Sequence, residues 1–148
     1  MNREITLTRT LDAPRQLVFQ AWTDPSHLGW FFNPDFPVDI APTVDLVPGG
    51  AWRQHMIVND ELEYVTGGIY REIVAPERIV IAWGAVGGWP EIDPDDLDAG
   101  PVLTITLVEI DADTTELTLH AVIPEKHWHP HMRDGWNLTI DRLAAQLG

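Results

Sequence analysis

The sequence predicts an α+β fold in which a curved antiparallel sheet packs against one long C-terminal helix. Segments in which apolar and polar residues alternate, typical of strands, recur from residue 43 to residue 122 with turn residues between them. Near the C-terminus the apolar residues instead recur every three or four positions, which is typical of a helix. The N-terminal part contains one strand pattern and two short helical patterns. The expected order is therefore β-α-α-β-α, with five or six strands in the second β stretch.

Length and charge restrict the classes of protein that the chain can belong to. We expect residues 1–148 to form a single domain, because no change of composition divides them. The chain has no cysteine, which excludes disulfides and thiolate metal sites. Its formal net charge of −14 disfavours nucleic acid and membrane surfaces as partners, because both are anionic. Residues 1–20 lack the apolar core of a signal peptide, so a soluble, cytoplasmic protein is expected.

The N-terminal patterns define three elements. Residues 4–11 alternate and predict a half-buried strand. Its apolar side is expected to hold Ile5, Leu7 and Leu11. Asp12 is expected to cap a first helix, with Pro14 in the first turn. The apolar face of that helix is expected to hold Leu17, Val18, Ala21 and Trp22. Asp24, followed by a proline, predicts a second helical stretch over residues 25–31.

The central region predicts an antiparallel meander, and the C-terminus predicts a helix. Strands are expected over residues 43–48, 51–58, 63–74, 79–83, 102–110 and 114–122. Residues 84–101 break the alternation and contain five acidic side chains, so they predict a long acidic loop. One face of a final helix of about 15–18 residues is expected to hold Met132, Trp136, Ile140, Leu143 and Leu147.

Four segments also resemble a known family. Residues 11–32, 47–53, 67–83 and 134–147 are similar to the activator-of-heat-shock-ATPase-like family, within the START-related lipid-transfer and polyketide-cyclase superfamily. The resemblance covers nearly the whole chain. It implies the helix-grip fold, in which the sheet wraps the last helix and leaves a cavity between them. It does not imply one activity, since relatives include ligand carriers, cyclases, aromatases and a co-chaperone domain. The acidic loop 84–101 is longer than the resemblance leads us to expect.

The seven tryptophans suggest a pocket with aromatic walls. Its candidate lining is selected by strand alternation, by helical spacing and by the expected closure of one end by the second helix. The candidates are Trp30, Phe32, Trp52, Met56, Trp83, Met132 and Trp136. Trp89, in the acidic loop, is a candidate lid over the pocket mouth. The same side chains could instead fill a solid core, and their spacing does not separate the two possibilities.

The histidines give weaker evidence for a functional site than the tryptophans do. His127, His129 and His131 alternate and could present imidazoles to a metal ion, but no acid stands at a familiar ligand spacing. A solvated loop is the simpler interpretation, so we expect no metal and no cofactor. His55 and His120 fall on the polar sides of their strands and are expected to face solvent.

Three function hypotheses remain open. The first is a non-enzymatic protein that binds a small hydrophobic or aromatic molecule between the sheet and the last helix. The second is an enzyme of the cyclase or aromatase type, which needs an ionisable side chain in the cavity. The third, implied by the resemblance, is a co-chaperone that acts on a heat-shock ATPase. A homodimer through a sheet edge or a helix is also expected.

Overall fold

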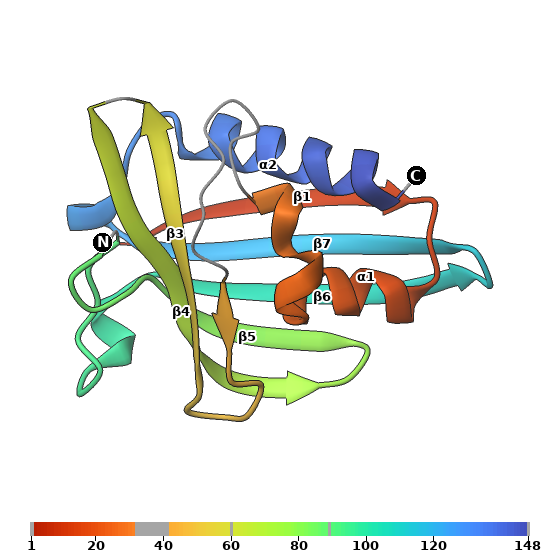
Figure 1. Ribbon diagram of the computed structural model, residues 1–148, viewed down its shortest axis with the longest axis horizontal. Helices are drawn as coiled ribbons and strands as arrows, with labels where there is room; N and C mark the ends of the chain where they lie inside the picture. The colour runs from red at the N-terminus through yellow and green to blue at the C-terminus, as the bar shows by residue number, and fades with distance from the viewer. Residues whose placement is uncertain (1, 32–41, 60, 89, 148) are drawn as a thin grey trace.

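The chain forms one antiparallel sheet with helices packed along it (Figure 1). The computed structural model describes residues 2–31, 42–59, 61–88 and 90–147. The strands are β1 (Asn2–Leu11), β2 (Thr43–Val44), β3 (Ala51–Asn59), β4 (Leu62–Val74), β5 (Arg78–Trp83), β6 (Val102–Asp111) and β7 (Thr114–Pro124). They lie in the order β1-β7-β6-β5-β4-β3-β2, and each neighbouring pair is antiparallel. The helices are α1 (Arg15–Thr23) and α2 (Met132–Leu147), with the 3-10 helices η1 (Pro25–Phe31), η2 (Leu97–Ala99) and η3 (Glu125–His127).

This arrangement confirms the expected helix-grip α+β fold. The helix α2 runs along the sheet beside β1, and the β3–β4 hairpin rises toward the N-terminal end of α2 (Figure 1). Burial alternates along β6 and β7, so that one face of the sheet is apolar. The helix turns Met132, Trp136, Ile140 and Leu143 toward that face, as the spacing predicts. The core therefore lies between the inner face of the sheet and the helices.

The first helix differs from the expectation in two respects. It begins at Arg15, and the carbonyl of Pro14 accepts its first backbone hydrogen bonds, so Pro14 takes the cap position and the expected Asp12 cap is wrong. Leu17 was expected on the buried face but is 48% exposed. Phe19 is buried instead, on the side of the helix away from Leu17, together with the expected Val18, Ala21 and Trp22.

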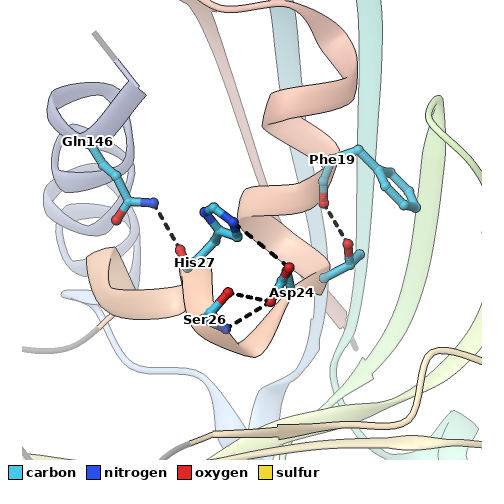
Figure 2. Close-up of polar contacts among 6 residues, drawn as sticks. Phe19, Asp24, Ser26, His27 and Gln146 are labelled. Carbon is cyan, nitrogen blue, oxygen red and sulfur yellow. Dashed lines mark hydrogen bonds and ion pairs between the residues drawn. The ribbon is translucent and has the colours of Figure 1, made fainter.

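The 3-10 helix η1 connects α1 with the C-terminal end of α2 (Figure 2). The Asp24 carboxylate accepts hydrogen bonds from the hydroxyl and the backbone N–H of Ser26, at 2.7 and 2.9 Å, and these bonds lower the pKa of Asp24. The Gln146 side-chain amide donates to the carbonyl oxygen of His27 at 2.9 Å. The predicted helical stretch after Asp24 is therefore confirmed, although it is a 3-10 helix.

Two further segments differ from, or extend, the expectations. The strand expected over residues 43–48 is only Thr43–Val44 long, because Asp45 already opens a tight turn in which the Gly50 N–H donates to the carbonyl of Val47. In the acidic loop, Asp98 forms an ion pair with Arg71 of β4. Of the helices in the described ranges, none has the length and apolar character needed to cross a membrane.

Candidate functional site

A pocket of about 450 Å³ lies between the inner face of β3, β4 and β5 and the N-terminal half of α2. Its walls are mostly apolar side chains, with hydroxyl and imidazole groups among them. The lining consists of Met56, Leu62, Tyr64, Thr66, Trp83, His129, His131, Met132, Gly135, Trp136 and Thr139. The pocket therefore borders the half of α2 that follows directly after the histidine run.

Two tryptophans form the aromatic wall of the pocket. Trp83 ends β5, and Trp136 lies one turn into α2, where the helical spacing turns it toward the sheet. Their ring centroids are 5.2 Å apart at an interplanar angle of 63°, an edge-to-face contact. Each is only 5% exposed. Because both indoles are held between strand and helix, they present a fixed apolar surface to the pocket.

Four of the seven candidate lining residues meet in this pocket, namely Met56, Trp83, Met132 and Trp136. Trp52 does not line it. Trp52 is buried on the same face of β3 as Met56, and its indole N–H donates to the Oε1 atom of Gln54 at 3.0 Å. The Trp30 side chain, Phe32 and the candidate lid Trp89 lie outside the described residues.

The mouth of the pocket carries two imidazoles. His129 and His131 are exposed, and their ring centroids are 5.2 Å apart. The backbone N–H of His131 donates to Nδ1 of His129 at 3.1 Å. In the neutral imidazole this bond leaves the proton on Nε2, so His129 offers a hydrogen-bond donor there.

The third histidine of the run faces a different hollow. Burial, together with the charge of Lys126, lowers the pKa of His127. The side chains of Lys126 and His127 line a hollow of about 490 Å³ beneath the acidic loop, together with Glu91 and Asp93. Among the described residues, no group of three or more His, Cys, Asp or Glu side chains is placed to hold a metal ion. The alternating histidines are thus divided between two surfaces.

The two histidines within strands, His55 and His120, lie on the outer face of the sheet, as expected. The Nε2 atom of His55 is 3.5 Å from the Glu63 carboxylate. The Nε2 atom of His120 is 2.9 Å from the Glu4 carboxylate. Both pairs are at least partly exposed, so neither histidine contributes to the pocket.

Sequence reasoning missed the polar part of the lining. Tyr64 and Thr66 alternate along β4 on the same face as Gly68, so period 2 alone could have found them. Gly135 and Thr139 are four positions apart on α2, and helical spacing links them in the same way. Periodicity assigns these residues to inner faces, but threonine and glycine are not by themselves typical of a pocket wall.

The electrostatics of the pocket contrast with those of the chain. The formal net charge is −14, yet the described lining contains no Asp, Glu, Lys or Arg. The nearest cation to Thr139 on its own helix is Arg142, whose Nη2 atom is 3.4 Å from the Thr139 Oγ1 atom. Burial lowers the pKa of Arg142 and raises the pKa of the Tyr64 phenol. The site therefore suits an uncharged apolar molecule.

Solved structures share this architecture. An uncharacterized protein from Rhizobium leguminosarum is 20% identical, with a TM-score of 0.72 over 99% of this chain and 95% of that one. A protein from Chromobacterium violaceum is 25% identical, with a TM-score of 0.72 over 97% and 96% of the two chains. An AHSA1-like protein from Aeromonas hydrophila is 18% identical, with a TM-score of 0.74 over 97% and 91%.

Family comparison agrees with the fold. No curated protein matches the chain. Residues 12–148 match the model of a family described as Activator of Hsp90 ATPase homolog 1-like protein. That match spans α1, the acidic loop, the pocket and α2, which is far more than half of the chain. The chain therefore belongs to the Activator of Hsp90 ATPase homolog 1-like family.

Proposed function

We propose that this protein binds a small, flat, apolar molecule between β3–β5 and α2, without a covalent step. The observation that supports the proposal is the uncharged lining of the pocket around the Trp83–Trp136 pair. A volume of about 450 Å³ falls within the range of small-molecule sites, about 300–1,000 Å³. The helix-grip fold of the family is also of a ligand-binding type.

Apolar burial would supply the affinity. A bicyclic aromatic ligand and the pocket walls would together remove about 300 Å² of apolar surface from water. At about 25 cal/mol per Å² this gives about 7.5 kcal/mol before the cost of lost motion is subtracted. Dissociation constants from micromolar to millimolar are therefore expected.

The test uses N-phenyl-1-naphthylamine, a neutral dye whose emission rises in apolar sites. Titration of the wild-type protein should give a saturable rise. Gly135→Leu should weaken dye binding at least tenfold, because Gly135 lines the pocket and a Cβ added there meets nothing within 4 Å, so the new side chain enters open space.

Leu138→Ala is the matched control, since Leu138 lies on the same helix, is 61% exposed and does not line the pocket. Its affinity for the dye should equal that of the wild type. If neither the dye nor a panel of flat apolar compounds binds the wild type saturably, the proposal is wrong.

A second function, of the cyclase or aromatase type, is favoured by the ionisable groups of the lining, Tyr64, His129 and His131. A base in this pocket should accelerate the ring opening of 5-nitrobenzisoxazole, a flat aromatic compound that loses a proton from carbon. His131→Gln should remove the acceleration, because Nδ1 of His129 already accepts the His131 backbone N–H. His127→Gln, in the other hollow, should leave it unchanged. A wild-type rate equal to that of buffer would argue against this function.

The family description leads to a third proposal, action on a heat-shock ATPase. It is tested by the ATP turnover of a purified Hsp90 chaperone with and without this chain. Stimulation would support the proposal, and an unchanged rate would remove it. The expected homodimer and cytoplasmic location likewise stay predictions, the first of which sedimentation can check.

A further inference from the structure

We propose that the ligand of this pocket is neutral and carries a hydroxyl or carbonyl oxygen at its buried end, where the Thr66 hydroxyl binds it. This inference rests on the proposed ligand-binding function and specifies its chemistry. Thr66 lies on the inner face of β4, lines the pocket and is only 2% exposed. It is therefore a deep polar group in a mostly apolar site.

Among the described residues, no side chain is placed to pair with the Thr66 hydroxyl, and the fully buried polar atoms without a partner do not include it, so this hydroxyl opens onto the pocket. Its cross-strand neighbour is Gln54, directly opposite on β3. The Gln54 amide is directed along its own strand instead, with Oε1 accepting from the indole N–H of Trp52 at 3.0 Å and Nε2 lying 3.9 Å from the sulfur of Met56. A ligand oxygen that pairs with this hydroxyl inside an apolar pocket would add to affinity, whereas a ligand that covers the hydroxyl without pairing would leave it unsatisfied.

The other threonine of the lining is different. The Thr139 hydroxyl already donates to the backbone carbonyl of Gly135 at 2.9 Å, within α2. Both threonines thus border the same pocket, but only Thr66 has its hydroxyl proton available for a ligand. This difference makes Thr139 an internal control for Thr66.

The lining also restricts the charge of the ligand. A carboxylate or phosphate at the depth of Thr66 would lose its hydration, and the described lining has no Lys or Arg to compensate. A hydroxyl or carbonyl oxygen is neutral, and either can pair with a hydroxyl that both donates and accepts. The ligand class is therefore a flat apolar alcohol, phenol or ketone.

The experiment compares 2-naphthol with 2-methylnaphthalene, which have nearly the same shape but differ in one hydroxyl. Each displaces N-phenyl-1-naphthylamine from the wild type, Thr66→Val and Thr139→Val. The ratio of the two affinities should shift by about five- to tenfold toward 2-methylnaphthalene in Thr66→Val, because the ligand hydroxyl loses its partner. In Thr139→Val the ratio should stay within about twofold of the wild-type ratio.

A Thr66→Val ratio equal to the wild-type ratio would overturn this inference and leave the proposed function standing, provided that both compounds displace the dye. If the dye itself does not bind the wild type, the proposed function and this inference fail together. Urea unfolding gives a readout that does not depend on ligand. Thr66→Val should unfold at a urea midpoint equal to or above that of the wild type, and a clear fall would show that the hydroxyl is already bonded within the protein.

Discussion

Gly135 offers a sharp test of the pocket because one substitution should move stability and binding in opposite directions. It lies in the first turn of α2 and lines the pocket, and a Cβ added there meets nothing within 4 Å. A glycine in a helix loses more conformational entropy on folding than alanine, by about 0.5–1 kcal/mol. Gly135→Ala should therefore raise the free energy of unfolding by about that amount.

The assay is urea unfolding followed by circular dichroism at 222 nm, with a thermal melt beside it. A gain of about 1 kcal/mol moves the melting temperature of a domain this size up by about 3 °C. With a denaturant slope of about 2 kcal/mol per molar, the same gain raises the urea midpoint by about 0.5 M. The N-phenyl-1-naphthylamine affinity should fall along the series Gly135, Ala, Leu, because each side chain fills more of the hollow.

Gly68→Ala is the contrasting substitution. A Cβ at Gly68 would lie 2.2 Å from the Cγ2 atom of Ile81 and 2.7 Å from the carbonyl oxygen of Ala82, so this variant should be destabilised. If Gly135→Ala were destabilised as well, there would be no open space beside α2 at this position. The reasoning from an open pocket would then be refuted.

Three further outcomes follow from the same contacts. Trp136→Ala should lose about 3–5 kcal/mol of unfolding free energy in urea melts, because it empties an indole site in the core. Burial raises the pKa of both tyrosines, Tyr64 and Tyr70, above their ordinary value of about 10. Their contribution to stability is thus present below about pH 10 and is lost as pH rises toward the folded-state pKa. The 295 nm phenolate signal should therefore appear above about pH 10 and together with alkaline unfolding. Arg9→Ala should cost less than about 1 kcal/mol, since the Arg9–Asp141 pair is largely exposed.

Periodicity predicted most of the fold because burial repeats along the chain. Met56 and Trp83 follow period 2 in their strands, while Met132 and Trp136 follow the helical period, and all four reach the pocket. Trp52 obeys the same alternation and is buried, yet it packs beside the pocket and not against it. Which buried side chain borders a hollow depends on strand twist and on the cross-strand neighbour, and neither is encoded locally.

The Asp12 cap failed for a related reason. Aspartate before a proline is a good local signal for a helix start. In the folded chain the carbonyl of Pro14 accepts the first helical hydrogen bonds, and β1 continues to Leu11. The boundary is therefore set by where the strand must end to keep its pairing with β7, a long-range condition that a cap signal does not contain.

The position of the hollow follows from the unequal support of α2. Toward its C-terminal end, Leu143 is fully buried and Gln146 is bonded to η1, which itself contacts α1. α1 packs on β6 and β7, so that half of the space is filled. The N-terminal half of α2 instead faces β3, β4 and β5, where the lining runs from Met132 to Thr139 on the helix. The sheet curves toward α2 along the whole helix, but α1 is inserted under only one end. Space is therefore left at the other end, and side chains of ordinary size border that space without closing it.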